Sequence, residues 1–206
     1  MMMRRRGTVI FLLAVLTLSL CAAGDRLKTP PSAYRQSAAS YLPLTGEARA
    51  TQWRAVNVND VKSRNIYALF MRVNPRLSSS DVKKYIEIIF DACAKFKQDP
   101  YVIAGIIVHE STVNSKAVSK GGDYGLMQVR WKVHTKAIKQ RFPKVKHGKD
   151  ILDARTNIFF GTEIFSDCMK KSNGDVSKGL LRYSAGNTKL RDKVLATVKE
   201  LQRKGR

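Results

Sequence analysis

The chain has 206 residues, of which 44% are hydrophobic, and its 38 lysines and arginines outnumber its 16 aspartates and glutamates to give a formal net charge of +22. This length predicts one domain with a real core, with or without a tail. The charge predicts polyanionic partners, but no signature of a nucleic-acid-binding module accompanies it, which argues against specific nucleic-acid recognition.

Residues 1–24 have the pattern of an export signal. Arg4 to Arg6 form a charged start, and the almost wholly apolar residues 8–23 follow. Because this segment is short for a membrane span, we predict cleavage near Gly24, with an uncleaved anchor as the alternative. Cys21 lies where a lipid could be attached, but a leucine precedes it where a small residue is usual. We therefore interpret Cys21 as part of the signal.

Cleavage near Gly24 removes three arginines and no acidic residue, so the net charge falls from +22 to +19. For an exported chain, the anionic surface of the cell envelope is the favoured partner of these basic residues. We predict a location in the periplasm or cell envelope of a bacterium. Residues 132–149 form the one dense basic run, and a solvated surface is its simplest interpretation.

Residues 25–77 are predicted to form a basic N-terminal tether or extension, flexible at least in part. Prolines and small residues without a clear period fill its first half. Residues 53–74 are ambiguous, because apolar residues with helical spacing end at Asn74-Pro75. Residues 78–206 are predicted to form the folded domain.

Helical signals dominate this domain. Ser78-x-x-Asp81 is typical of a helix start, and Asp99-Pro100 combines an N-cap aspartate with proline at the first helical position. Further helices are predicted at about 151–172, 175–184 and 190–203. With few strand signals and no repeats, the sequence predicts a mainly α fold.

Two cysteines remain after the signal, Cys93 and Cys168. In an exported chain they could form a disulfide, or they could be two buried thiols that act as small apolar residues. The sequence leaves these alternatives equal. Three cysteines without a C-x-x-C pattern argue against structural zinc, so no metal is predicted.

Glu110 lies at the end of the second predicted helix. With Ile103, Ile106 and Ile107 it follows helical spacing, so its side chain lies on an apolar stripe. Partial desolvation would raise its pKa and keep it protonated near neutrality, as a general acid requires. The negative potential of a helix C-terminus acts in the same direction. A helix cap or a surface ion pair is the structural alternative.

Four short motifs resemble, in order and spacing, those of the lytic transglycosylase (SLT-type) domain of the lysozyme-like superfamily. They are Glu110-Ser111, Ala117-Val118-Ser119, Gly125-Leu126-Met127-Gln128 and Tyr183-Ser184-Ala185-Gly186. Asn157-Ile158-x-x-Gly161 fits the same pattern, and the likeness covers about residues 80–190. It implies a helical domain with a substrate cleft that cleaves the β-1,4 bond between N-acetylmuramic acid and N-acetylglucosamine in peptidoglycan glycan strands. The products would have 1,6-anhydro ends, and no cofactor is implied.

The resemblance also implies roles for single residues. Glu110 would be the only acid/base, protonating the leaving oxygen and then accepting a proton from the muramyl C6 hydroxyl. Ser119 and Gln128 would bind the sugar and its N-acetyl group. Tyr183 would orient Glu110 or the muramyl ring, or it is a core aromatic with a satisfied hydroxyl. For Met127 we predict a core position.

Asp123 is the most consequential departure from the family pattern; Val113 and Ser184 are smaller ones. Asp123-Tyr124-Gly125 also resembles the strand of animal-type lysozymes, in which the aspartate is a second catalytic carboxylate. A hydrolytic muramidase that uses Glu110 and Asp123 is therefore the first alternative. We favour a simpler role for Asp123, as a turn residue that satisfies backbone donors.

Other enzyme classes lack their motifs. His109-Glu110 begins an H-E-x-x-H pattern, but Val113 occupies the second histidine position. Neither a phosphate-binding loop nor a G-x-S-x-G elbow occurs. The alternative outside enzymology is a non-catalytic component that binds or assembles the cell wall through its basic surface. A role beside an envelope-spanning machine is compatible with either function.

Overall fold

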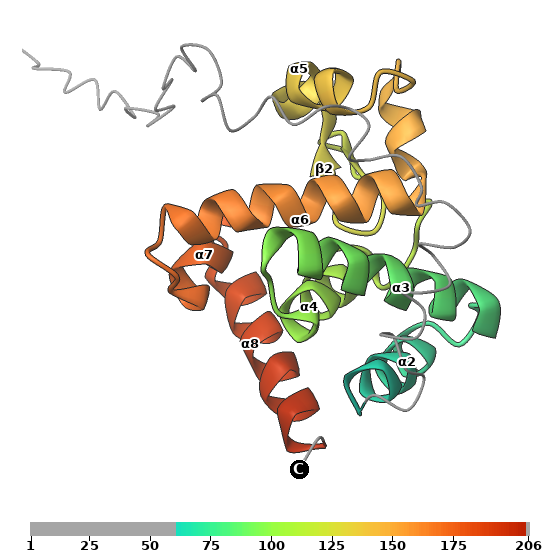
Figure 1. Cartoon of the computed structure of the whole chain (residues 1–206), viewed down its shortest axis with the longest axis vertical. Helices are drawn as coiled ribbons and strands as arrows, with labels where there is room; N and C mark the ends of the chain where they lie inside the picture. The colour runs from blue at the N-terminus through green and yellow to red at the C-terminus, as the bar shows by residue number, and fades with distance from the viewer. Residues whose placement is uncertain (1–60, 205–206) are drawn as a thin grey trace, which may run out of the picture. The chain divides into compact units, whose positions relative to one another are not determined.

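The computed structural model describes residues 61–204. In this range seven α-helices, one 3-10 helix and two short strands form a mainly helical domain (Figure 1), which confirms the predicted fold class. None of the helices in the described range combines the length and the apolar character that crossing a membrane requires. The predicted export signal, Cys21 and residues 25–60 lie outside the described residues.

Helix α2 (Val61–Val73) ends where Asn74-Pro75 predicts. Its Ile66 and Phe70 side chains are completely buried, and the helix packs against α3, α4 and α8. The last part of the predicted extension therefore shares its core with the residues after 78.

The capping signals of the next two helices are confirmed. Helix α3 (Ser79–Phe96) begins after Ser78, whose hydroxyl accepts a hydrogen bond from the backbone N–H of Asp81 at 3.0 Å. Helix α4 (Pro100–Ser111) begins after Asp99, which caps the N–H of Tyr101 in the same way. Every residue from Tyr101 to Val108 is buried, so α4 is a central helix covered on all sides. The predicted stripe of Ile103, Ile106 and Ile107 is buried, and the other faces of the helix are buried as well.

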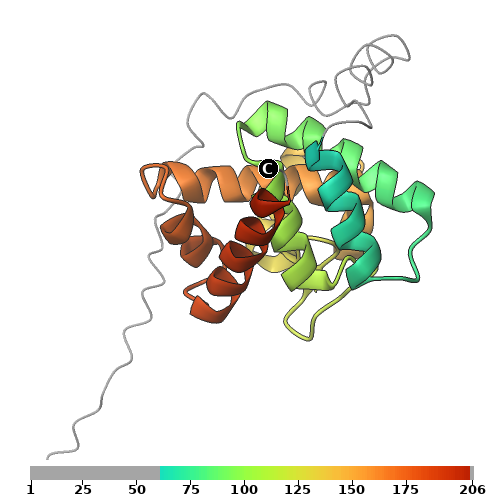
Figure 2. The same ribbon diagram turned by 90° about the horizontal axis from the view of Figure 1, so that it is seen from below.

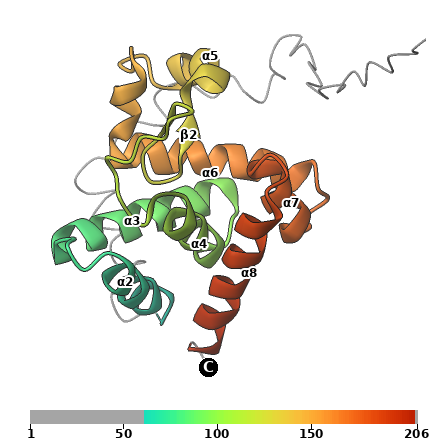
Figure 3. The same ribbon diagram turned by 180° about the vertical axis from the view of Figure 1, so that it is seen from behind.

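Helix α6 (Ala154–Lys170) packs against α3, and the strands and α5 lie on the other side of it (Figures 1 and 3). It starts later than predicted, because Gly148–Leu152 form the 3-10 helix η3 and Asp153 caps α6. Helix α7 (Val176–Tyr183) folds back against α6. Helix α8 (Thr188–Arg203) starts after its N-cap Asn187 and packs along α4 (Figure 2).

The strands β1 (Asp123–Tyr124) and β2 (Val129–Arg130) form an antiparallel pair. Asp123 lies opposite Arg130, and Tyr124 lies opposite Val129. Side chains directly opposite one another extend on the same face of a sheet. The register therefore brings the side chains of Asp123 and Arg130 together.

Helix α5 (Trp131–Arg141) follows β2 without a loop, inside the basic run for which the sequence predicts no helix. Most of its basic side chains are exposed, but Arg141 is buried and its Nε donates to Glu163 Oε1 at 3.0 Å. The basic run is thus a solvated surface with one member that anchors α5 to α6.

The amide of Asn157 connects α6 to the segment that follows β1. Its Oδ1 accepts from the N–H of Met127 at 2.8 Å, and its Nδ2 donates to the carbonyls of Tyr124 and Ile151 at 2.8 and 3.0 Å. Asn157 is only 1% exposed, so water cannot replace these partners. One side chain therefore fixes residues 124–127 against α6 and η3.

Two glycines permit this close approach. Gly125 has φ +74°, and a Cβ there would lie 2.4 Å from Asn157 Nδ2. A Cβ on Gly161 would lie 2.6 Å from the sulfur of Met127, which is fully buried as predicted. Any larger residue at either position would push the loop away from α6.

The two cysteines are free thiols. Cys93 is buried and Cys168 is half-buried, and no disulfide joins them. Burial raises the pKa of the Cys93 thiol far above its usual range, which keeps it protonated. Of the alternatives that the sequence leaves open, the structure contains the free thiols.

Replacing Asn157 tests the role of its amide. Asn157→Ala would remove the hydrogen bonds to the Met127 N–H and to the carbonyls of Tyr124 and Ile151, so we expect the free energy of unfolding to fall by about 2–4 kcal/mol in denaturant titrations. Asn114→Ala is the matched control: its exposed amide accepts one hydrogen bond, from the N–H of Lys116, and we expect a loss of about 0.5 kcal/mol. Equal losses in the two variants would contradict the assigned role.

Candidate active site

A cavity of about 370 Å³ opens between the end of α4, the strand pair, α5 and the α7–α8 connection. Its wall combines acidic, basic, amide and aromatic side chains with a few apolar ones. The lining residues are His109, Glu110, Asp123, Gln128, Val129, Arg130, Val133, His134, Ile164, Tyr183, Ser184, Ala185, Asn187 and Leu190. The cavity thus contains Glu110, Asp123, Gln128 and Tyr183 of the predicted site.

Glu110 reaches the cavity from the last turn of α4 and is half-buried. Within residues 61–204, no hydrogen bond or salt bridge reaches its carboxyl group. Burial, followed by the negative charge of Asp123, raises the pKa of Glu110 to about 7, while the positive charge of Arg130 acts in the opposite direction. Glu110 is therefore neither a helix cap nor a surface ion pair, and it can gain or lose a proton near neutrality.

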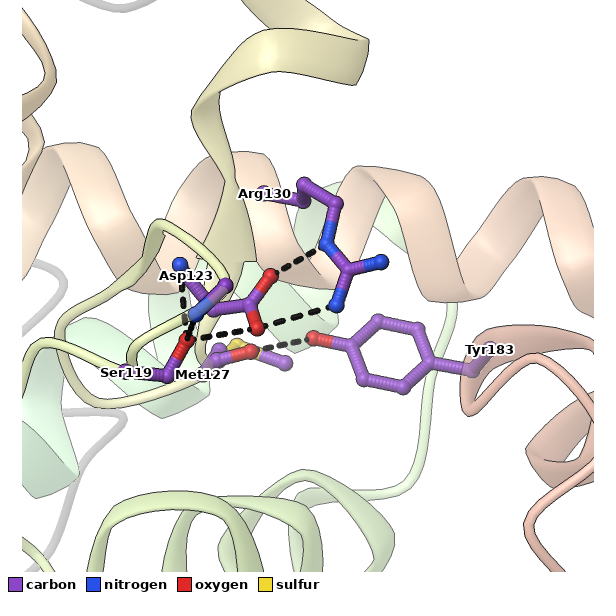
Figure 4. Close-up of polar contacts among 6 residues, drawn as sticks. Ser119, Asp123, Met127, Arg130 and Tyr183 are labelled. Carbon is purple, nitrogen blue, oxygen red and sulfur yellow. Dashed lines mark hydrogen bonds and ion pairs between the residues drawn. The ribbon is translucent and has the colours of Figure 1, made fainter.

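Asp123 is held as an ion pair (Figure 4). Arg130 donates from Nε to Oδ1 at 2.6 Å and from Nη2 to Oδ2 at 3.0 Å, and Ser119 donates from its hydroxyl to Oδ2 at 2.8 Å. The hydrogen bond from Arg130 is the main reason that the pKa of Asp123 lies below its usual range. Asp123 is thus an ionised carboxylate with both oxygens engaged.

The turn before β1 is built by Ser119 and not by Asp123. The Ser119 hydroxyl accepts from the N–H groups of Gly121 and Asp123 at 3.2 and 3.0 Å while it donates to the Asp123 carboxylate. Its one donor and both acceptor positions are therefore in use. Ser119 does not line the cavity, and its hydroxyl is hydrogen-bonded to the Asp123 carboxylate.

Tyr183 lies at the end of α7 and faces the loop of residues 125–128. Its hydroxyl donates to the carbonyl oxygen of Met127 at 2.7 Å (Figure 4). Burial, and secondly the negative charge of Glu110, raise the pKa of Tyr183 well above its usual range. Because its only proton is used by Met127, the hydroxyl can accept a hydrogen bond from a protonated Glu110 but cannot donate one to it.

Gln128 lies directly after the buried loop and has φ +47°. Its Nε2 donates to the carbonyls of Gly125 and Ala117 at 3.0 and 3.3 Å. These bonds fix the amide plane and orient the side chain at the cavity wall. The remaining amide oxygen is an acceptor suited to an N–H or O–H of a ligand.

Arg130 and His134 line the cavity but were not among the predicted site residues. The signal that identifies Arg130 is the register of β1 and β2, which places it opposite Asp123. His134 follows on the first turn of α5, where its ring packs edge-on against Phe160 at 5.7 Å between centroids. Burial lowers the pKa of His134, so it is neutral at pH 7.

His109, the neighbour of Glu110, is used structurally. Its Nε2 lies 2.9 Å from the hydroxyl of Thr197 on α8, and burial lowers its pKa. Within residues 61–204, no group of three or more histidine, cysteine, aspartate or glutamate side chains could hold a metal ion. The groups in the cavity suit proton transfer to an oxygen atom of a bound ligand by Glu110.

Comparison with known proteins gives a family match. The model of the "Transglycosylase SLT domain" family matches residues 87–204. The chain is 28% identical over 117 residues, 54% of its length, to a protein of Buchnera aphidicola subsp. Acyrthosiphon pisum (strain APS) named "Membrane-bound lytic murein transglycosylase E". It is 32% identical over 126 residues, 56% of its length, to "Membrane-bound lytic murein transglycosylase C" of Klebsiella pneumoniae (strain 342). The match spans 52% of the first relative and 34% of the second.

The raised pKa of Glu110 predicts a pH-dependent effect on stability. The contribution of Glu110 to the free energy of unfolding is fully present below its usual pKa of about 4.5. This contribution is lost as the pH rises through about 7, because the folded protein must then bury a charged carboxylate. Glutamine does not ionise, so Glu110→Gln is free of this loss. We therefore expect the difference in unfolding free energy, variant minus original protein, to be about 1–3 kcal/mol larger at pH 8 than at pH 4.5.

Glu200→Gln provides a control of opposite sign. Its hydrogen bonds to Arg72 and Lys204 lower the pKa of Glu200 to about 2. Its stabilising contribution is therefore fully present above the usual pKa of about 4.5 and is lost as the pH falls from there through about 2. This variant should be less stable than the original protein at pH 8. A stability difference for Glu110→Gln that does not change between pH 4.5 and pH 8 would show that Glu110 titrates normally.

Proposed function

Because the chain belongs to the transglycosylase SLT domain family, we propose that it is a peptidoglycan lytic transglycosylase. Its substrate would be the β-1,4 bond between N-acetylmuramic acid and N-acetylglucosamine in the glycan strand. The observation that carries this proposal is the unpaired Glu110 carboxyl in the cavity wall, whose pKa of about 7 suits both halves of an acid/base cycle.

In the proposed reaction, protonated Glu110 first donates its proton to the leaving glycosidic oxygen as the bond from that oxygen to muramyl C1 breaks. The carboxylate so formed then accepts the proton of the muramyl C6 hydroxyl as O6 bonds to C1. The product has a 1,6-anhydro ring, no water is consumed, and Glu110 is protonated again. One carboxyl group can thus perform both steps.

The state of Asp123 supports this route over hydrolysis by two carboxylates. A general-base or nucleophilic aspartate must be basic enough to take a proton or attack carbon, but the hydrogen bonds from Arg130 and Ser119 stabilise the Asp123 carboxylate and lower its pKa. We therefore propose that Asp123 contributes a negative charge to the cavity wall and does not react with the sugar. The hydrolytic muramidase remains the alternative that product analysis tests.

For substrate binding we propose Gln128 and Tyr183. Gln128 would accept a hydrogen bond from the sugar or its N-acetyl group, because its amide nitrogen is already fixed by two carbonyls. Tyr183 would orient Glu110 by accepting a hydrogen bond from its protonated carboxyl group, while the Tyr183 hydroxyl donates its own hydrogen bond to the carbonyl of Met127. Ser119 would have an indirect role, because its hydroxyl accepts a hydrogen bond from the N–H of Asp123 and so fixes the turn before β1.

We further propose that the protein acts in the bacterial cell envelope. Both relatives are named as membrane-bound murein transglycosylases, and residues 1–24 have the pattern of an export signal. Lys132, Lys136 and Lys139 are exposed on α5, whose Val133 and His134 line the cavity. Such basic residues beside the cavity suit an anionic wall.

Product analysis tests the proposal. Purified peptidoglycan is digested with the protein and with Glu110→Gln, and the soluble products are examined by mass spectrometry. We expect anhydro-muramyl ends from the original protein and at least a 1,000-fold lower rate from the variant, because general acid and base catalysis are both lost. Products heavier by one water would instead establish hydrolysis. A variant that sediments with peptidoglycan as well as the original protein does would show that binding is intact.

The pH dependence of cleavage follows from the same residue. Cleavage requires protonated Glu110, so kcat/KM should be highest below pH 7 and fall about tenfold per pH unit above it. Binding of Glu110→Gln to peptidoglycan, measured over the same pH range, is the control and should not change at this midpoint. Constant cleavage from pH 6 to pH 9 would exclude Glu110 as the general acid.

A further inference from the structure

We propose that the two charges of the Asp123–Arg130 ion pair, fixed in the same cavity wall as Glu110, adjust how readily Glu110 releases its proton. The inference rests on the proposed function for its catalytic meaning, but the effect on Glu110 can be measured without catalysis. Arg130 is the new element: it holds the Asp123 carboxylate in place and adds a positive charge to the cavity wall near Glu110.

The geometry of the pair is fixed from three sides. The antiparallel register places Asp123 directly opposite Arg130, and two hydrogen bonds of 2.6 and 3.0 Å join their side chains. Ser119 fixes the carboxylate from behind at 2.8 Å (Figure 4). A planar guanidinium with two parallel bonds to a carboxylate is the most directional ion pair that side chains form. The two charges therefore keep constant places in the cavity wall.

The other groups around Glu110 carry no charge at neutral pH. His109 beside it on α4 and His134 on α5 have lowered pKa values, and Tyr183 on α7 has a raised one. Lys193 of α8 acts on His109 but does not line the cavity. Within the described residues, Asp123 and Arg130 are thus the charges in the cavity wall that act on Glu110.

These two charges act on Glu110 in opposite directions. The carboxylate of Asp123 raises the pKa of Glu110, and the guanidinium of Arg130 lowers it. Together they form a nearly neutral pair, so burial remains the main influence on Glu110. Without Arg130, the Asp123 carboxylate, whose side chain is 16% exposed, would act unopposed on Glu110. Without Asp123, the guanidinium of Arg130 would act alone, but its side chain is 54% exposed and water screens its charge.

The direct test is an NMR titration of the Glu110 carboxyl in the whole protein and in three variants. Arg130→Met should move the midpoint to higher pH by about one unit. Asp123→Asn should move it to lower pH by a smaller amount, because water screens the exposed guanidinium of Arg130. Arg130→Lys retains the charge and should return the midpoint close to the original value. The alkaline limit of cleavage should move with each midpoint.

Arg72→Met is the matched control. Arg72 forms an equally two-pronged ion pair with Glu200, at 2.8 and 3.1 Å, between α2 and α8 and outside the cavity lining. Its loss should leave the Glu110 midpoint unchanged. This variant separates the effect of position from the general effect of losing a surface ion pair.

Shifts of opposite sign in Arg130→Met and Asp123→Asn support the proposal, since a purely structural role would not reverse sign between the two partners. Unchanged midpoints, or shifts in the same direction, would overturn it. If the midpoints shift but the limit of cleavage does not follow them, the ion pair still sets the proton affinity of Glu110. In that case it is the proposed function of Glu110 that fails.

Discussion

The buried amide of Asn157 is the contact on which the cavity depends. It connects α6 to the loop that contains Met127, and that loop in turn offers a carbonyl to Tyr183 and leads into Gln128. Gly125 makes this approach sterically feasible because it has no side chain and adopts a positive φ. A polar group so deeply buried is favourable only when all its partners are present. Helix α6 therefore determines the position of the cavity wall through Asn157, although few of its own residues line the cavity.

The same packing creates the chemistry at Glu110. α4 is covered on all sides, so its last turn carries a carboxyl group out of an apolar interior without supplying a partner for it. The fold loses stability whenever this group ionises, and that loss is the physical origin of its raised pKa. Asp123, only a short distance along the chain, has the opposite behaviour because Arg130 and Ser119 satisfy it. Two carboxylates in one cavity are thus given different roles by their surroundings.

Local signals were reliable where the interaction is local. The caps at Ser78 and Asp99 were predicted correctly because each involves a backbone N–H two or three residues away. α5 was missed since its exposed lysines obscure the apolar period, and its anchor is the distant ion pair between Arg141 and Glu163. Glu110 was recognised from its motif and its place at a helix end, and the structure agrees with the predicted direction of its pKa shift.

By itself, the sequence determined the helical class, the starts of α3, α4 and α7, and the identity of the family, because capping residues, periodicity and motif spacing are properties of neighbouring residues. Only the tertiary structure decided which partners the site residues have. Ser119 turned out to hold Asp123, Tyr183 to bond to Met127, and Arg130 to join the site. These contacts form between residues on different elements, or across a strand register, and their energies depend on burial that no local pattern encodes.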